Sequence, residues 1–301
     1  MIISYNTHIN GGGDLVAQEP FHIGILNLMH DKEETQARFE NVLKATDYPI
    51  TLEFFYPISH YQDRPVPELV RTISKPLTLR NLARFDGFII TGAPIEELDF
   101  LVVQYWQEIQ ALMDELDRLA IPQLYVCWGA MAALYHFYGI EKRSLPVKYF
   151  GVFENQIVVP TPLLAGLSTR FLAPHARYAE MDWHQLRRVP TLTINASSKD
   201  GFLFLLTNVK RRQAFVFAHL EYEGEALLSE YQREVAAHPE KTYRRPLNYF
   251  RDPELMQEPQ FKWQTTQQRF FSNWLRQLDS YRRQTEVEEK LWSKLLTQLL
   301  N

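Results

Sequence analysis

The single cysteine of the chain, Cys127, lies in a context typical of a catalytic nucleophile. The apolar residues Leu124–Val126 predict a buried strand before it, and the small residues of Trp128–Leu134 predict a helix after it. A thiol on such a turn projects from the carboxyl end of a sheet. The helix N-terminus lowers its pKa and offers backbone N–H groups to an oxyanion. The alternative is an inert core cysteine, because free cysteine is among the most buried residue types.

A histidine and a glutamate stand two residues apart after another apolar run. Residues Ala214–Ala218 predict a strand that leads into His219 and Glu221. Side chains two apart on an extended segment point to the same face, so Glu221 can fix the tautomer of His219 and stabilise its imidazolium. Alone, the pair could be a surface histidine beside a surface glutamate. Together with Cys127 it favours a Cys–His–Glu triad for acyl transfer.

Two backbone N–H groups are candidates for an oxyanion hole. Trp128 follows the nucleophile directly, and Gly92 stands in the segment Thr91–Pro94 after a predicted strand, which could equally be a plain turn. We expect no metal site, because the nine histidines are scattered and there is one cysteine. We also expect no tightly bound cofactor, because the chain lacks the G-x-G-x-x-G and P-loop motifs.

The elements that must position these residues alternate between strand and helix. Apolar runs predict strands at His22–Leu28, Ile50–Tyr56, Phe85–Ile90 and Pro122–Cys127, with helices at Asp31–Thr46, Leu101–Leu119 and Trp128–Leu134. This alternation predicts an α/β fold, a flavodoxin-like and mostly parallel sheet with helices on both faces. Later strands are expected at 152–159, 192–196, 202–207 and 214–218, and helices at 223–237 and from Trp263 onward.

Composition and charge limit the classes of function. The chain has 301 residues, 46% hydrophobic and 23% charged, as in an ordinary globular protein. A net charge of -4 gives no reason to expect nucleic acid or an anionic membrane as partner. No apolar run approaches the roughly 20 residues that span a bilayer. One cysteine and no recognisable signal peptide fit the cytoplasm. We divide the chain into an N-terminal arm (1–20), a catalytic domain (21–281) and a C-terminal helical extension (282–301).

Several motifs in one order resemble the homoserine O-acyltransferases of the homoserine O-succinyltransferase type. That family's fold is similar to class I glutamine amidotransferases. The matching segments are Ile23–Met29, Phe85–Gly87, Thr91–Pro94, Val126–Trp128, Tyr138–Ile140, Phe171–His175, Arg177–Tyr178, His219, Glu221–Tyr222, Asn248–Phe250 and Ser272–Leu275. The resemblance implies that Cys127 takes the acyl group of an acyl-CoA, that His219 is the base and that Glu221 orients it. It also implies a homodimer.

The resemblance extends to the substrate contacts. Lys148 and Arg233 match family residues that hold the amino-acid substrate, and an arginine can clamp an α-carboxylate in bidentate fashion. The second family position after Thr-Gly-Ala-Pro sets the acyl donor. Here it is Glu96, which implies acetyl-CoA, because a carboxylate would fill the acyl pocket and repel the distal carboxylate of a succinyl group.

The departures from the family pattern concern the acceptor. Ala176 replaces the serine of Pro-His-Ser-Arg and Arg177 follows it, and we expect both beside the substrate. Asp31 replaces a lysine of Pro-Lys-Lys, and Leu220 the proline of His-Pro-Glu. A lost hydroxyl partner changes selectivity by roughly 1–3 kcal/mol. L-homoserine, in methionine biosynthesis, is the expected acceptor. L-serine, one methylene shorter and used in cysteine biosynthesis, is the alternative.

Other interpretations stay open. Succinyl-CoA could be the donor. A glutaminase-type amide hydrolase would use the same triad, although the elbow Val-Cys-Trp-Gly lacks the glycine that amidotransferases place before the cysteine. In a non-catalytic binding protein the triad would be a relic. The tail has an apolar stripe at helical spacing that could pack on the core or form a dimer contact: Trp292, Leu295, Leu296, Leu299 and Leu300.

Overall fold

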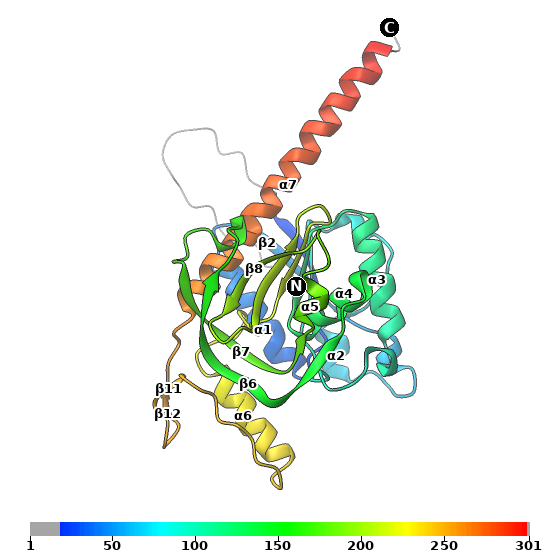
Figure 1. Cartoon of the computed structure of the whole chain (residues 1–301). Coiled ribbons are helices and arrows are strands. Elements are labelled where there is room, and N and C mark those ends of the chain that lie inside the picture. Colours follow the sequence, from blue (N-terminus) through cyan, green and yellow to red (C-terminus); the bar gives the residue numbers. More distant parts are fainter. Residues whose placement is uncertain (1–18, 300–301) are drawn as a thin grey trace.

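The protein is built around one ten-stranded sheet with the strand order β3-β2-β1-β4-β5-β10-β9-β8-β6-β7. The computed structural model describes residues 19–299, without the side chains of residues 288, 289 and 293–299. A separate small hairpin consists of β11 (Phe250–Asp252) and β12 (Gln257–Pro259). Helices lie on both faces of the sheet (Figure 1), which confirms the predicted α/β class.

Six neighbouring strands form the parallel part of the sheet. All their mutual pairings are parallel, and the strands are β1 (Phe21–Leu26), β2 (Ile50–Tyr56), β3 (Lys75–Pro76), β4 (Gly87–Ile90), β5 (Gln123–Val126) and β10 (Gln213–Val216). The central strands β4, β5 and β10 are buried along their whole length, as expected where both faces are covered. Their carboxyl ends meet at one edge of the sheet.

Antiparallel strands complete the sheet: β6 (Lys142–Ile157), β7 (Arg170–Met181), β8 (Thr193–Ser198) and β9 (Leu203–Asn208). The sequence predicted β8 and β9 to within two residues. It was wrong about β6, which begins ten residues earlier than expected, and it missed β7. Pro146 and Pro174 obscure both strands, and the register of the β6–β7 pair shifts between Ser144 and Tyr149. Such an irregularity breaks the alternation of apolar and polar residues.

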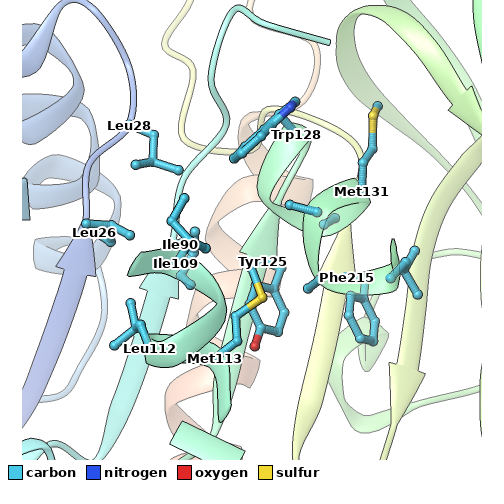
Figure 2. Packing of buried hydrophobic residues seen from close by; sticks show 14 of the residues in the cluster. Leu26, Leu28, Ile90, Ile109, Leu112, Met113, Tyr125, Trp128, Met131 and Phe215 are labelled. Atoms are coloured by element: carbon cyan, nitrogen blue, oxygen red, sulfur yellow. The ribbon is translucent and has the colours of Figure 1, made fainter. Parts of the chain in front are cut away.

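Two apolar cores flank the parallel strands, because neighbouring residues on a strand point to opposite faces. On one face Leu26, Ile90 and Tyr125 pack under α3 (Trp106–Arg118) and α4 (Trp128–Tyr138) (Figure 2). On the other, buried residues of β1, β4 and β5 pack against α1 (Lys32–Lys44) and the first part of α7 (Gln264–Leu299); they are Ile23, Ile25, Ile89, Leu124 and Val126. The strand ends that carry Cys127, His219 and the turn after β4 are therefore held between two packed layers.

Further helices connect these elements. They are α2 (Glu68–Ile73), α5 (Trp183–Leu186), α6 (Ala226–Ala237) and the 3₁₀ turns Ser59–Tyr61, Leu82–Arg84, Phe100–Val102 and Pro162–Leu164. The helix predicted at Leu101–Leu119 is interrupted. A 3₁₀ turn occupies Phe100–Val102, because Asp99 accepts from the N–H of Leu101, and the α-helix begins at Trp106.

The C-terminal helix α7 is continuous from the core into the predicted extension. Arg282 still contacts the domain, with Nη2 lying 2.8 Å from Oδ2 of Asp86. Beyond it the helix projects away from the sheet (Figure 1), and Val287, Leu291 and Trp292 are exposed. The side chains of Leu295, Leu296, Leu299 and Leu300 and the first 18 residues of the arm lie outside the described part of the chain. No helix within residues 19–299 is both long and apolar enough to cross a membrane.

Candidate active site

Cys127 occupies a sharp turn between β5 and α4. Its backbone has a φ of 48° and a ψ of -110°, a conformation that L side chains rarely adopt. Its N–H donates to the carbonyl of Val216 on β10 over 2.7 Å, so the turn is tied to the neighbouring strand. Gly129 is required by the close packing of this turn, because a Cβ there would lie 2.7 Å from the carbonyl oxygens of Ile90 and Thr91. The strand-to-helix turn expected at Cys127 is present, and its backbone is strained.

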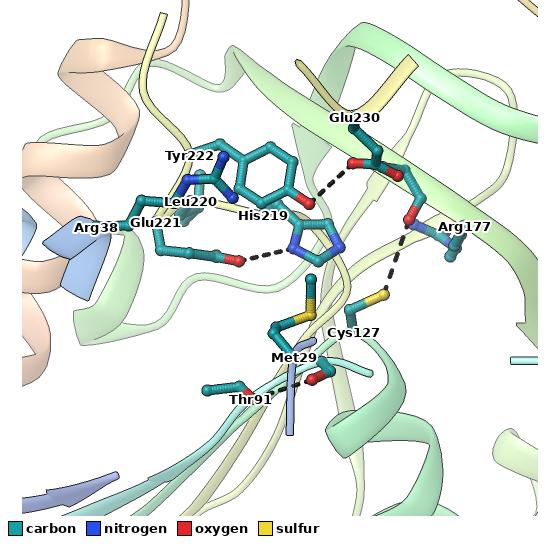
Figure 3. A network of polar contacts seen from close by, with 12 residues as sticks. Met29, Arg38, Thr91, Cys127, Arg177, His219, Leu220, Glu221, Tyr222 and Glu230 are labelled. Atoms are coloured by element: carbon teal, nitrogen blue, oxygen red, sulfur yellow. Dashed lines mark hydrogen bonds and ion pairs between the residues drawn. The ribbon is translucent and has the colours of Figure 1, made fainter. Parts of the chain in front are cut away.

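The neighbouring strand ends bring three residues together. Cys127 follows β5, His219 follows β10 and Gly92 follows β4, and both β4 and β10 pair with β5. A Cβ built on Gly92 would lie 3.3 Å from Cε1 of His219 and 3.4 Å from Cβ of Cys127. Any larger residue at position 92 would therefore enter the space between the sulfur and the imidazole. Figure 3 shows His219 above Cys127, with Met29 beside them.

His219 is fixed by Glu221 and faces the thiol. Nδ1 of His219 lies 2.7 Å from Oε1 of Glu221, and both side chains are almost fully buried. Burial by itself lowers the pKa of His219. The charges of Glu221 and Cys127 and side-chain hydrogen bonds to both residues outweigh it, so the pKa lies well above its usual value. Because the carboxylate accepts from Nδ1, Nε2 is the nitrogen left to exchange a proton with the sulfur.

Two backbone N–H groups near the sulfur are free. Within residues 19–299, the N–H groups of Gly92 and Trp128 donate to no protein acceptor. Trp128 is the first residue of α4, where N–H groups point out of the helix end. On another side, Sγ of Cys127 lies 4.0 Å from the carbonyl oxygen of Ala176 on β7. The position where the family has serine therefore lies directly beside the nucleophile.

A network of buried polar groups extends from His219 to the edge of β6. The phenol of Tyr222 stacks on the imidazole, and its hydroxyl donates to Oε2 of Glu230 over 2.8 Å. The other oxygen of Glu230 pairs with Lys148, whose Nζ also lies 2.8 Å from Oε1 of Glu234. Burial lowers the pKa of Lys148, but the two carboxylates outweigh it and raise the pKa above its usual value. Lys148 is thus charged and already paired with two carboxylates.

Glu96 lies close to the same network. Burial raises its pKa to about 7, although the charges of Lys148 and His219 act in the opposite direction. The side chain is 9% exposed, and the carboxylate pairs with no cation among the described residues. A carboxyl group that is half protonated near neutral pH therefore stands near the triad. It is carried by the segment that follows β4.

Arg233 lies at the rim and is already paired. Nη1 of Arg233 on α6 lies 2.8 Å from Oδ2 of Asp31, which precedes α1. Oδ2 of Asp31 also lies 3.2 Å from Nε2 of His30. Nε and Nη2 of Arg233 have no partner within residues 19–299. Nε and Nη2 of the guanidinium are therefore available to a ligand. Nη1 is paired with Asp31, the residue that departs from the family pattern.

The prediction that Arg177 contacts the substrate is not supported by its geometry. Its side chain is fully buried, and its guanidinium donates to the carbonyls of Phe217 and Leu203, to Oε2 of Glu180 and to Nδ1 of His175. These contacts join β7 to β9 and to the segment after β10. Arg177 therefore holds together the backbone beneath the site.

Sequence reasoning missed two members of the network. Glu230 and Glu234 carry no motif, but they lie four positions apart on α6, and residues at such spacing share a helix face. Tyr178 also donates to Glu234. The spacing on α6 was therefore the available signal. No group of three or more metal-ligating side chains occurs in the part of the chain that the structure describes.

The fold is like that of the glutamine amidotransferases, and Cys127, His219 and Glu221 lie together at one edge of its sheet. A solved glutamine amidotransferase from Thermotoga maritima superposes with a TM-score of 0.61, covering 87% of this chain and 99% of that one at 10% sequence identity. At that identity the likeness concerns the fold alone.

The sequence comparisons are more specific. The model of the homoserine O-succinyltransferase family matches residues 16–284, and the chain belongs to this family. It is 51% identical to a serine O-acetyltransferase of Lactobacillus acidophilus, over 85% of this chain and 95% of that one. It is 35% identical to a homoserine O-acetyltransferase of Thermotoga neapolitana, over 85% of this chain and 84% of that one. The protein is thus an O-acyltransferase, and the family predicted from the motifs is confirmed.

Proposed function

We propose that this protein is a serine O-acetyltransferase that moves the acetyl group of acetyl-CoA to the hydroxyl of L-serine. L-homoserine, the acceptor favoured by the sequence alone, is the second candidate. The observation that carries the mechanism is the contact of Gly92, Cys127 and His219 at three adjacent strand ends, with Glu221 behind the imidazole. The choice of serine is supported by the 51% identical relative and by the position of Ala176, whose backbone carbonyl oxygen lies 4.0 Å from the sulfur.

In the first half-reaction, the Cys127 thiolate attacks the thioester carbon of acetyl-CoA. A new C–S bond forms to Cys127, the C–S bond to CoA breaks, and the CoA thiolate takes the proton that His219 holds. The N–H groups of Gly92 and Trp128 stabilise the oxyanion between these events. One thioester replaces another, so the acetyl group is stored at little cost in free energy.

In the second half-reaction, the hydroxyl of the acceptor attacks the acetyl-enzyme. His219 removes the hydroxyl proton as the C–O bond forms, and it returns this proton to the sulfur as the C–S bond breaks. Glu221 stabilises the imidazolium in both halves. In the resting enzyme burial lowers the pKa of His219, but the charges of Glu221 and of the Cys127 thiolate together raise it. Acetylation removes the contribution of the sulfur, and transfer of the proton to CoA leaves a neutral imidazole able to act as a base.

The acceptor is held at the rim. The free half of the Arg233 guanidinium suits its α-carboxylate, and Lys148 is the second cation at this position. Glu230 and Glu234 already neutralise Lys148, so Arg233 is the main carboxylate ligand in this proposal. Glu96 limits the acyl pocket to an acetyl group. We also propose a homodimer in the cytoplasm, which light scattering and cell fractionation would test.

The test is CoA release by the purified protein. Acetyl-CoA and succinyl-CoA are each combined with L-serine, L-homoserine or L-glutamine, and Cys127→Ala is the matched control. Turnover of acetyl-CoA with serine supports the proposal, and faster turnover with homoserine would favour the second acceptor. Ammonia release from glutamine without CoA would replace both with an amide hydrolase. Equal activity of Cys127→Ala would exclude the thioester mechanism.

A further inference from the structure

The side chain of Tyr222 is contacted on both faces of its ring and at its hydroxyl group. The centroids of its ring and the His219 imidazole are 4.5 Å apart with a plane angle of 28°, and Cζ of Arg38 lies 4.5 Å from the ring centroid. Figure 3 shows the phenol between these two groups. Its hydroxyl donates to Glu230 over 2.8 Å. A ring fixed at this many points presents a rigid, flat surface to the imidazole.

The backbone of Tyr222 is fixed as well. Its N–H donates to the carbonyl of His219 over 3.0 Å, which closes a turn that brings the two rings together. Its carbonyl accepts from Nε1 of Trp263 over 2.9 Å and from Nε2 of Gln267 over 3.0 Å. The position of the phenol relative to the imidazole is therefore set by the surrounding fold and does not depend on a bound ligand.

The imidazole has three restraints, and the reaction removes one of them. In the resting enzyme Cys127, Glu221 and Tyr222 all contact His219. Acylation of Cys127 converts the thiolate to a thioester, which cannot take part in the charge-assisted contact. The hydrogen bond to Glu221 then fixes one nitrogen but permits the ring to tilt about that contact. The stacked phenol is what remains to fix the ring plane.

We propose that Tyr222 is a positioning residue that acts mainly in the second half-reaction, when His219 must deprotonate the acceptor hydroxyl. A correctly aimed base transfers a proton far faster than a mobile one, because reacting atoms displaced by about 1 Å cost on the order of 100-fold in rate. In the first half-reaction the sulfur itself orients the imidazole. This inference rests on the proposed acyl-transfer mechanism and extends it to a residue outside the triad.

The experiment separates the two half-reactions in the full-length protein. Rapid-quench measurement of CoA released from acetyl-CoA without acceptor gives the rate of acylation. Mixing the isolated acetyl-enzyme with L-serine or L-homoserine gives the rate of transfer. Tyr222→Leu removes the flat ring, and Tyr222→Phe keeps it. Tyr249→Leu is the matched control, because Tyr249 is fully buried in the same apolar cluster and its hydroxyl donates to the carbonyl of Gly224.

We expect Tyr222→Leu to slow transfer at least tenfold more than acylation, Tyr222→Phe to retain both rates within about threefold, and Tyr249→Leu to leave their ratio unchanged. If Tyr222→Leu does not fold, Tyr222→Met fills the same volume without a flat face and gives the same comparison. Equal slowing of both half-reactions, or a Phe variant as impaired as Leu, would overturn the inference. A wild-type enzyme that releases no CoA from acetyl-CoA would overturn the proposed function itself, and this inference with it.

Discussion

Nη1 of Arg233 lies 2.8 Å from Oδ2 of Asp31, so the arginine at the rim of the site is oriented by a carboxylate from the loop before α1. The contact joins two segments that are 202 residues apart in the chain. Both side chains are partly exposed, which limits the free energy of the pair to about 1 kcal/mol or less. Its effect is therefore geometric: it directs the free half of the guanidinium.

Asp31→Asn should weaken acceptor binding and leave acylation intact. Without the ion pair Arg233 is free to move, so we expect KM for the acceptor to rise about fivefold, with a larger rise for L-serine than for the longer L-homoserine. Steady-state kinetics with both acceptors measures this. Glu33→Gln, an exposed acid in the same turn of α1, is the control. An unchanged KM for both acceptors would show that Asp31 does not contribute to acceptor binding.

Glu96→Gly should widen the choice of acyl donor. The substitution removes a buried carboxyl group and its repulsion of a second carboxylate. We expect turnover of succinyl-CoA to appear and that of acetyl-CoA to fall about tenfold, as pocket changes of this size do. Parallel assays of CoA release measure both, with the exposed neighbour Glu97→Gly as control. Failure to use succinyl-CoA would place the donor pocket elsewhere.

The same residue predicts a pH dependence of stability. Burial raises the pKa of Glu96 from 4.5 to about 7, so the folded protein binds more protons than the unfolded chain between these values. The stabilisation is complete below about pH 4.5 and is lost as the pH rises through about 7, a change of about 3 kcal/mol. Denaturant unfolding of wild type and Glu96→Gln at pH 5 and pH 8 tests this. Relative to Glu96→Gln, the wild type should have a lower free energy of unfolding at pH 8 than at pH 5.

The elbow makes a prediction about backbone strain. Cys127 has a φ of 48°, which glycine adopts freely and alanine does not. Both Cys127→Gly and Cys127→Ala remove the sulfur and abolish acylation. We expect the glycine variant to be more stable than the alanine variant by about 1–2 kcal/mol. Thermal unfolding of the two variants provides the comparison, and a more stable alanine variant would argue against strain at this position.

The variant Arg177→Met tests whether Arg177 stabilises the fold or contacts the acceptor. Arg177→Met removes the cation that pairs with buried Glu180, so we expect the free energy of unfolding to fall by roughly 3–5 kcal/mol. KM for the acceptor should change little at a temperature where the variant is folded. A large rise in KM with normal stability would instead restore Arg177 to the substrate site.

The sequence predicted the parallel part of the sheet well, because the fully buried strands β4 and β5 appear as uninterrupted apolar runs. Cys127, His219 and Gly92, each of which follows such a run, were expected at one edge of the sheet, and they lie close together there. It failed at β6 and β7, where prolines and partly exposed residues hide the pattern. The motif around Arg177 gave no sign that its guanidinium is buried and bonded to other parts of the protein, as the structure shows.

The contacts between Glu230, Tyr222 and Lys148 were out of reach for a different reason. They join residues from α6, the turn after β10 and the long strand β6, so no local pattern encodes them. The same holds for Asp31 and Arg233, whose individual positions were noted but whose pairing was not. Long-range polar contacts depend on how the layers pack, which sequence periodicity does not specify.

The backbone hydrogen bond from Cys127 to Val216 has a consequence for the chain during its synthesis. Residues 127 and 216 are separated by four strands and several connections, so the elbow cannot close until most of the polypeptide has left the ribosome. Until then the cysteine lacks His219, which activates it in the proposed mechanism, so we expect it to react as an ordinary thiol. We therefore expect a truncated or half-folded copy to be inactive toward the cell's pool of thioesters.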